Sequence, residues 1–461
     1  MLVVGPDLVL PAGLVGPGDQ VGVEGGNHVP VTAVVAASCH RPWICSAAVA
    51  VRNRLYPAAV QVGTLSRHCE DARFVWNLAV EQQSWWWPGR GVAPGGVERQ
   101  RQLAQARAAE PWLQAGSSSV QQQALRDFDR AMAAFFRADN PTGKPRYRSK
   151  RGRQGFVIRD TRVRRITRRW GEVQVPKCGW VRFRWTRTLP AELGMARVTV
   201  DRAGRWHVAF PAPQPALARR AGSGPAGIDR GVRTALVTSG GQHYRAPRIS
   251  GRQAARYLAL ERQLRRQAKG SRRRDKTRQA MAQITARVTD RRRDWAEKIS
   301  TRLVKEHDVI VLEKLSTSAM VRKPKAKPDP EHPGAFLPNR ARAKAGLNRA
   351  ILGSCWGLLA QRAEQKAAAS GAAVIYVDPR FTSQQCHVCG HTAPGNRESQ
   401  AVFRCQQCGH SDHADVNAAR NILARGLAPM GVPAPAPGHG AHARVSRQPA
   451  LAPLEPAWSA A

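Results

Sequence analysis

The sequence predicts a multidomain α+β protein, in which an N-terminal β region interrupted by helices precedes a mixed α/β sheet with a small cysteine-rich insertion. Three observations support this fold class. Alternating strand patterns occur in two separate parts of the chain, apolar residues recur at helical spacing beside them, and two CxxC pairs stand just before the last predicted helix. With 461 residues, 42% of them hydrophobic, the chain can build two or three packed domains.

The two ends of the chain differ from the rest in composition. Residues 1–48 are rich in Gly, Pro and Val, which predicts a disordered leader or an over-extended start, with the natural start near Val51. This segment has no basic n-region and is broken by Pro and Gly, so we expect no signal peptide, no membrane partner and a cytoplasmic protein. Residues 427–461 are rich in Ala and Pro and predict a disordered tail.

Residues 49–215 predict an N-terminal β domain with a helical insertion. Two helices are expected to turn apolar stripes to a core, formed by Leu65, Cys69, Ala72 and Trp76 in one and by Leu125, Phe128, Met132 and Phe135 in the other. The stretch ARVTVDRAGRWHVAF predicts a hairpin with a glycine turn. In VRFRW, Val181, Phe183 and Trp185 alternate with Arg182 and Arg184. The cationic face of that strand either lies on a phosphate backbone or is simply solvated.

Residues 216–380 predict the first part of a mixed α/β domain. GIDRGVRTALVTSGGQHYR indicates three strands joined by two turns, with Asp229 in the first strand. An arginine-loaded helical region over 252–293 follows, then an amphipathic helix over 294–306 that leads into the apolar strand VIVL and Glu313. After a loop rich in Lys, Arg and Pro, a helix over about 347–369 returns to the strand AVIYV.

The cysteine pairs in residues 381–411 predict a structural zinc ribbon. Cys386 and Cys389 are followed after fifteen residues by Cys405 and Cys408, and a glycine follows each pair. Four thiolates complete a tetrahedral site and leave no position open for a substrate. Two redox dithiols are the weaker interpretation, because no thioredoxin-like unit surrounds them. Nearby histidines could also replace a thiolate ligand: His387, His391, His410 and His413. The remaining cysteines are scattered and indicate a reducing compartment, without a disulfide framework.

The charge of the chain points to a polyanionic partner. The formal net charge is +41, with 73 Lys and Arg against 32 Asp and Glu. Such an excess repels itself in a compact state unless an anion neutralises it, which favours nucleic acid. The arginine run in 252–293 is consistent with this, because like charges at helical spacing destabilise an isolated helix.

Three acids stand at the ends of separate predicted elements. Asp229 lies in the first strand of the meander, Glu313 follows an apolar strand, and Asp415 heads the helix VNAARNIL in residues 412–426. Alone, Asp415 would be interpreted as a helix cap. The order of all three fits a mixed sheet of the RNase H class, in which such carboxylates converge on two divalent ions. Close carboxylates repel each other without cations, so Mg²⁺ is expected.

The chain resembles the TnpB family of transposon-encoded RNA-guided DNA nucleases. The resemblance lies in GIDRGV, VIVLEKLSTSAM, TSQQCHVCG, FRCQQCG and DVNAARNI, and it extends over about residues 52–425. It implies a β-barrel-like N-terminal domain with a REC-like helical insertion, and a RuvC-like nuclease domain interrupted by the zinc ribbon. It also assigns Asp229, Glu313 and Asp415 as catalytic, Mg²⁺-binding acids. Lys314 and His413-Ala414 depart from the family pattern beside two of them.

The resemblance implies an enzyme that cleaves target DNA under the direction of a guide RNA, at the nucleoid. A compact type V CRISPR effector shares these motifs, and a guide-directed DNA-binding repressor without efficient cleavage is the non-enzymatic alternative. Direct transposase chemistry is not expected, because the sequence has no His-hydrophobic-His pair with a nearby Tyr.

Overall fold

The computed structural model describes residues 49–85, 93–137, 143–220, 224–332 and 334–431. The predicted leader over 1–48 and most of the predicted tail lie outside the described residues. Among the described residues, no helix is both long enough and apolar enough to cross a membrane.

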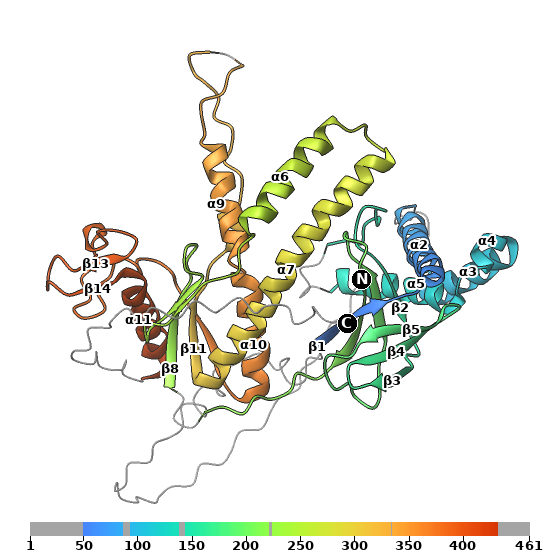
Figure 1. Cartoon of the computed structure of the whole chain (residues 1–461), viewed down its shortest axis with the longest axis horizontal. Coiled ribbons are helices and arrows are strands. Elements are labelled where there is room, and N and C mark those ends of the chain that lie inside the picture. Colours follow the sequence, from blue (N-terminus) through green and yellow to red (C-terminus); the bar gives the residue numbers. More distant parts are fainter. Residues whose placement is uncertain (1–48, 86–92, 138–142, 221–223, 333, 432–461) are drawn as a thin grey trace, which may run out of the picture. The chain divides into compact units, whose positions relative to one another are not determined.

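A seven-stranded antiparallel sheet forms the N-terminal part (Figure 1). Its strands are β1 (Val49–Tyr56), β2 (Gln154–Ile158), β3 (Val163–Thr167), β4 (Trp170–Val175), β5 (Gly179–Arg184), β6 (Ala196–Val200) and β7 (Trp206–Ala212). They are ordered β2-β6-β7-β1-β5-β4-β3, so that β1 pairs with both β5 and β7. This is a half-barrel, and in the described strands β2 and β3 remain its edges. The predicted hairpin is β6 and β7, with Gly204 at positive φ in its turn.

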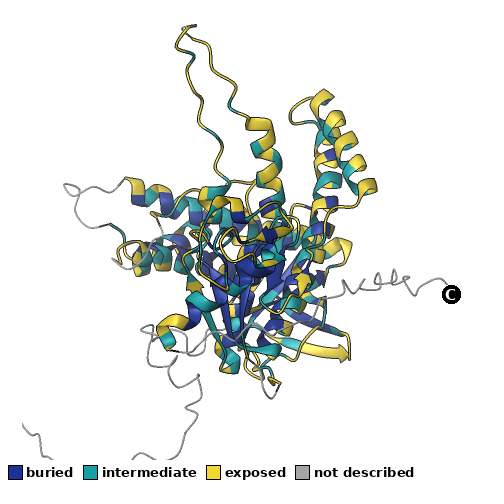
Figure 2. Ribbon diagram, turned by 90° about the vertical axis from the view of Figure 1, so that its left-hand side faces the viewer, coloured by how far each residue is buried: buried dark blue, intermediate teal, exposed yellow. Residues whose placement is uncertain are grey.

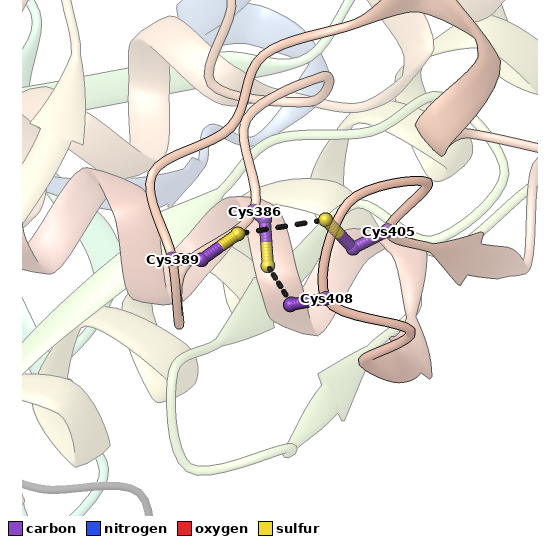
Figure 3. Close-up of side chains that lie close together, drawn as sticks. All are labelled: Cys386, Cys389, Cys405 and Cys408. Carbon is purple, nitrogen blue, oxygen red and sulfur yellow. Dashed lines mark hydrogen bonds between the residues drawn. The ribbon is translucent and has the colours of Figure 1, made fainter.

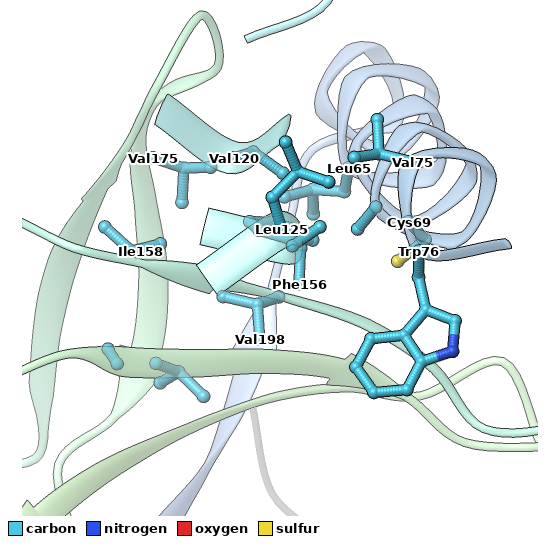
Figure 4. Close-up of a cluster of buried hydrophobic side chains, with 14 of the residues drawn as sticks. Leu65, Cys69, Val75, Trp76, Val120, Leu125, Phe156, Ile158, Val175 and Val198 are labelled. Atoms are coloured by element: carbon cyan, nitrogen blue, oxygen red, sulfur yellow. The ribbon is translucent and has the colours of Figure 1, made fainter. Parts of the chain in front are cut away.

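The helical insertion follows β1 directly. It consists of α2 (Ala59–Ser84), α3 (Gly96–Ala109), α4 (Pro111–Gln114) and α5 (Ser118–Phe135), of which α2 and α5 pack on each other and on β2. The predicted stripe on α2 is buried, and Leu125, Phe128 and Met132 of α5 are buried with it. Figure 4 shows Leu65, Cys69, Trp76 and Leu125 in this cluster. Phe135 is 36% exposed, so this part of the prediction was wrong: it is the last residue of α5.

The alternation predicted for β5 is confirmed. Val181 and Phe183 are fully buried, and Arg182 faces outward. Arg182 pairs with Glu172 of β4, and the guanidinium of Arg184 lies 5.1 Å from the ring centroid of Trp170. The arginines on this face are therefore partly engaged with the sheet itself.

A five-stranded mixed sheet forms the C-terminal part. Its strands are β8 (Gly224–Asp229), β9 (Leu236–Thr238), β10 (His243–Tyr244), β11 (His307–Glu313) and β12 (Ala373–Val377), ordered β10-β9-β8-β11-β12. The first three form the predicted antiparallel meander, and β11 pairs in parallel with β8 and with β12. Three parallel strands therefore end at one edge of the sheet, where β8 and β11 carry Asp229 and Glu313.

The arginine-rich region is a hairpin of two helices, α6 (Gly251–Arg266) and α7 (Arg272–Glu306). The predicted boundary at residue 294 is wrong, because α7 continues without interruption for 35 residues. The break lies instead at 267–271, where Gly270 has a φ of +88° and the Ser271 side chain accepts a hydrogen bond from the backbone N–H of Arg274. A glycine in the left-handed region and a serine cap end one helix and start the next.

The predicted helix over 347–369 is also two helices. After the short α8 (Thr317–Met320), α9 (Ala341–Gly353) and α10 (Trp356–Ser370) are separated at Cys355, which has a φ of +61°. The chain then enters β12 and the cysteine segment, which contains the 3-10 turn η2 (Pro394–Asn396) and the two-stranded sheet of β13 (Val402–Arg404) and β14 (Ser411–His413).

The last helix, α11 (Ala414–Leu427), covers the mixed sheet and is followed by a 3-10 turn, η3 (Ala428–Met430). Ten of the residues in α11 are buried, because its small and apolar side chains pack closely on the strands. In Figure 2 the buried residues gather on the strands and the helices that cover them, whereas the projecting helices are mostly exposed.

Candidate functional site

Two glycines allow α11 to lie directly on β8 and β11. A Cβ atom built on Gly227 of β8 would lie 2.1 Å from the carbonyl oxygen of Ala419 and 2.6 Å from the backbone nitrogen of Leu423. A Cβ on Gly426 of α11 would lie 2.5 Å from the side chain of Val311 in β11. Only a hydrogen atom fits at either position. The two glycines therefore allow α11 to lie directly against β8 and β11. This contact fixes the first turn of α11 relative to the strand ends (Figure 1).

The structure brings the three predicted acids together. Ile228 pairs with Leu312 across the parallel strands, so that Asp229 and Glu313 follow side by side at the same sheet edge. Asp415 lies in the first turn of α11, near enough for its charge to act on Asp229. Glu313 lies 84 positions after Asp229 in the chain and Asp415 lies 102 positions after Glu313, yet the three acids share one site.

The pKa of Asp229 reflects the closeness of the other two acids. Burial, together with the carboxylates of Glu313 and Asp415, raises the pKa of Asp229 to about 7, and the guanidinium of Arg397 partly opposes the rise. Burial also raises the pKa of Glu313, against the hydrogen bond from the Thr382 hydroxyl, which lies 2.8 Å from Oε1. Carboxylates that repel each other in a partly desolvated site attract cations, and this is the charge pattern of a divalent metal site.

Three residues that the sequence analysis did not identify hold these acids. Arg397 of the cysteine segment donates a 2.9 Å hydrogen bond to Oδ1 of Asp415. Thr382 holds Glu313, and the Arg230 guanidinium donates to the main-chain carbonyl oxygen of Glu313. Arg230 is adjacent to Asp229 in the sequence, so its position was a usable signal. Nothing local marks Arg397 or Thr382, because each reaches its acid through the fold.

Asp415 is not the cap of α11, which was the interpretation of this residue when considered alone. His413 is the N-cap of α11, and its Nδ1 accepts a hydrogen bond from the backbone N–H of Asp415. Because it does not cap the helix, the Asp415 carboxylate can accept the hydrogen bond from Arg397, and it lies at the favourable end of the helix dipole. His413, which departs from the family pattern, thus has a structural role here.

The four predicted zinc ligands form one cluster (Figure 3). The Sγ atoms of Cys386 and Cys408 lie 3.8 Å apart, and those of Cys389 and Cys405 lie 3.5 Å apart. Sulfurs held at about 2.3 Å around one tetrahedral ion lie about 3.8 Å from each other. The cluster therefore has the size that a tetrahedral ion requires, and its sulfurs are too far apart for disulfides.

The two CxxCG turns have the same hydrogen bonds. The N–H groups of Gly390 and Gly409 donate to the carbonyl oxygens of Cys386 and Cys405, at 2.9 and 3.0 Å. Both glycines have positive φ, at +77° and +71°, which explains why a glycine follows each pair.

A second group of possible ligands lies next to the cysteines. Atoms of His387, His410 and Asp412 lie within 4.8 Å of one another. The guanidinium of Arg420 lies among them, because its Nη1 is 2.8 Å from Asp412 and 3.3 Å from Nε2 of His387. A cation is thus already present, and the group connects the cysteine segment to α11. Among the described residues, the three acids do not form a group of this tightness. Acids that together hold two metal ions about 4 Å apart need not lie so close to one another.

Two asparagines on α11 anchor the cysteine segment. Asn417 and Asn421 are buried, one turn apart, and both donate to the carbonyl oxygen of Gln385, at 2.7 and 2.6 Å. Asn421 also donates to the carbonyl oxygen of Thr382, the residue that holds Glu313. Asparagine is a poor helix former, so two of them at i and i+4 in an apolar helix were a signal that the sequence analysis missed.

Comparison with known proteins connects most of the chain to one group. Residues 210–323 match the family described as "Probable transposase", residues 356–422 match "Cas12f1-like, TNB domain", and residues 49–91 match "Helix-turn-helix domain". In the last range the described residues, 49–85, form β1 and α2, a strand followed by one helix.

The chain is 32% identical over 383 residues to "Putative RNA-guided DNA endonuclease InsQ" of Escherichia coli (strain K12). That match covers 82% of this chain and 92% of the relative. It is 33% identical over 385 residues to "Putative RNA-guided DNA endonuclease" of Streptomyces pristinaespiralis, covering 82% and 89%. Among solved structures it is similar to "Cryo-EM structure of the Cas12f1-sgRNA-target DNA complex", with 12% identity, a TM-score of 0.40, and 82% and 99% coverage.

Proposed function

Because this chain belongs to the TnpB family of RNA-guided DNA endonucleases, we propose that it cuts DNA at sites chosen by a bound guide RNA. The observation that carries the proposal is the convergence of Asp229, Glu313 and Asp415 from two strand ends and one helix start. Full-length relatives favour this function over a compact CRISPR effector, since the Cas12f1-like family model covers only residues 356–422.

The strand order supports a RuvC-like, RNase H-like nuclease domain. Three antiparallel strands followed by two parallel ones, with a closing helix, is the arrangement expected for that fold. We assign this domain to residues 216–380 and 412–426, the zinc ribbon to 381–411, and the N-terminal domain with its REC-like insertion to 49–215. In this assignment the ribbon is inserted between the second and third catalytic acid.

The donor set of the acid site fits Mg²⁺, since it consists of carboxylate oxygens alone. When bound, Mg²⁺ ions supply an activated water and stabilise the charge on the leaving oxygen of a phosphodiester. The chain's own residues prepare that site. Asp229 must release the proton that its raised pKa retains, Thr382 orients Glu313, and α11 presents Asp415. Arg397, beside Asp415, adds a positive charge where a phosphate would enter.

The cysteine cluster fits a structural Zn²⁺ ion with four thiolate ligands. Its role would be to fold the segment that carries Thr382 and Arg397 against α11. The guide RNA would supply sequence choice by base pairing, so the protein needs positive charge more than base-reading side chains. A net charge of +41 provides it.

The proposal is tested by removing one carboxylate without changing its shape. Asp229→Asn should lower Mg²⁺-dependent, guide-directed cleavage by at least about a hundredfold, because a neutral amide is a poor ligand for the ions. Guide-directed DNA binding should change by less than about threefold, because the phosphate contacts lie elsewhere. Asp308→Asn, at the start of β11 and away from the acids, is the matched control and should cleave as the wild type does.

Cleavage should be followed on a labelled duplex, with the RNA that co-purifies with the wild-type chain as guide. If Asp229→Asn cleaves as fast as Asp308→Asn, the catalytic assignment fails. If the purified wild-type chain carries no RNA and RNA does not change its DNA cleavage, the RNA-guided assignment fails.

A further inference from the structure

A groove between α6 and α7 has the chemistry of an anion site. It has a volume of about 470 Å³ and lies near the start of α6, away from the tip of the hairpin. Its polar lining consists of Arg252, Arg256, Arg287, Gln253, Gln283 and Ser250. We call this groove the arginine notch. Its floor is formed by Ala280 and the buried Ile284 of α7.

The lining of the notch contains three guanidinium groups and no carboxylate. In the described part of the chain, Arg252, Arg256 and Arg287 have no ion pair and no hydrogen bond, and all three are exposed. Some other cations on the same hairpin have partners. Arg265 pairs with Glu261, and Arg291 donates to Gln253 at the edge of the notch. What distinguishes the notch is that three such arginines line one groove, from two helices, with no carboxylate among them.

The arrangement within the notch matches a phosphate-bearing chain. Arg252 and Arg256 are one turn apart on α6, and Arg287 faces the same groove from α7. Like charges at i and i+4 destabilise a helix, and an anion between them reverses that effect. Guanidinium groups form bidentate hydrogen bonds with phosphate oxygens, and amide and hydroxyl donors complete such contacts.

We propose that the arginine notch binds the phosphodiester backbone of the guide RNA. The inference rests on the proposed function and names a place where that partner is held. Two observations select the guide over the DNA target. Helix α6 has no buried residue, and residues 251–306 carry 18 Lys and Arg against 6 Asp and Glu. A helix with little packing and strong self-repulsion needs its counter-charge at all times. The guide is the nucleic acid that remains bound before a target arrives.

The test compares two triple variants of the full chain that lose the same charge from the same hairpin. In the notch variant, glutamine replaces each of Arg252, Arg256 and Arg287. The control variant replaces with glutamine three exposed arginines outside the notch, Arg262, Arg266 and Arg272. The probe is the RNA that co-purifies with the wild-type chain, sequenced, transcribed and fluorescently labelled, with binding measured over a range of salt concentrations.

The notch variant should bind this RNA at least about tenfold more weakly than the wild type. Its log-log salt slope should be shallower by about 2, since each phosphate contact contributes about 0.7 to 0.9. The control variant should bind within about threefold of the wild type. Thermal unfolding of both variants checks the fold, and if the triple notch variant is unfolded, Arg287→Gln against Arg272→Gln repeats the comparison.

Three outcomes would overturn the inference. Equal losses in the two variants mean that diffuse charge, and no site, binds the RNA. Wild-type RNA affinity in the notch variant means that the notch is not used. Weakened binding of a target duplex by the preassembled complex, with unchanged RNA affinity, means that the notch holds DNA. In all three cases the wild type still binds and uses its RNA, so the proposed function stands, whereas a wild type without RNA removes the proposed function itself.

Discussion

Replacing Gly227 with alanine should separate α11 from β8 and disable the acid site. The added Cβ would lie 2.1 Å from the Ala419 carbonyl oxygen, and real Cβ contacts essentially never fall below 3.0 Å. The neighbour is helix backbone, which cannot rotate away as a side chain can, so α11 must move by about 1 Å. Overpacking of this kind costs about 1 to 3 kcal/mol of unfolding free energy. For a domain of this size, each kcal/mol of lost stability lowers the Tm by about 2 to 4 °C.

The displacement should affect catalysis more than stability. Asp415 lies one turn before Ala419 on the same helix, so it moves with the backbone that Gly227→Ala displaces. A misplacement of about 1 Å in a catalytic geometry can lower the rate about a hundredfold. The assay measures guided cleavage and thermal unfolding on the same preparations, which shows whether the rate falls while most of the protein remains folded.

Gly224→Ala provides a matched control on the same strand. A Cβ built on Gly224 meets nothing within 4 Å, so this variant should match the wild type in Tm and in cleavage rate. The reasoning is refuted if Gly227→Ala and Gly224→Ala have the same Tm and the same rate, because α11 would then tolerate the added carbon without moving.

Two further predictions concern the metal sites. Cys405→Ser should lose the single zinc ion per chain, measured by atomic absorption, and should lower the Tm, whereas the same change at the separate Cys178 should retain the zinc. In Mg²⁺-free protein, the folded state keeps a proton on Asp229 up to its raised pKa of about 7, while the unfolded chain releases it near about 4. The free energy of unfolding should therefore fall as pH rises from about 4 to about 7. Asp229→Asn should flatten this part of the profile, and Arg397→Gln should extend it upward, because Arg397 lowers the pKa of Asp229. Unfolding at a series of pH values measures both, and parallel profiles for the wild type and Asp229→Asn would contradict the assignment.

Strands and turns could be predicted because their signals are local. Alternation identified β5 and the β6–β7 hairpin, and the Gly-Gly turn identified the hairpin of β9 and β10. Helix boundaries were less accessible. Gly270 and Ser271 were a readable break between α6 and α7, but the break at Cys355 was not, since non-glycine residues seldom adopt positive φ. No local pattern in the sequence marks that conformation.

The acids of the site could be identified for a similar reason. Asp229 and Glu313 end apolar strands, and parallel strands deliver their ends to one edge. The residues that orient them depend on long-range contacts. Arg397 reaches Asp415 across 18 residues that include the second cysteine pair, and Thr382 reaches Glu313 across 69 residues. Sequence patterns locate groups that a single element presents, whereas partners from separate elements appear only with the fold.

The four thiols and the carboxylates form one structural unit. Asp415 has its place only if α11 lies on β8, and the chain reaches α11 through the cysteine segment. That segment has few apolar residues of its own, with Phe403 as its largest buried side chain. A tetrahedral ion held by four thiolates can replace the missing core. Asn417 and Asn421 then join the folded segment to α11, and through Gln385 and Thr382 they connect it to Glu313. Loss of zinc should therefore weaken cleavage through the position of two acids, although no thiol touches the substrate.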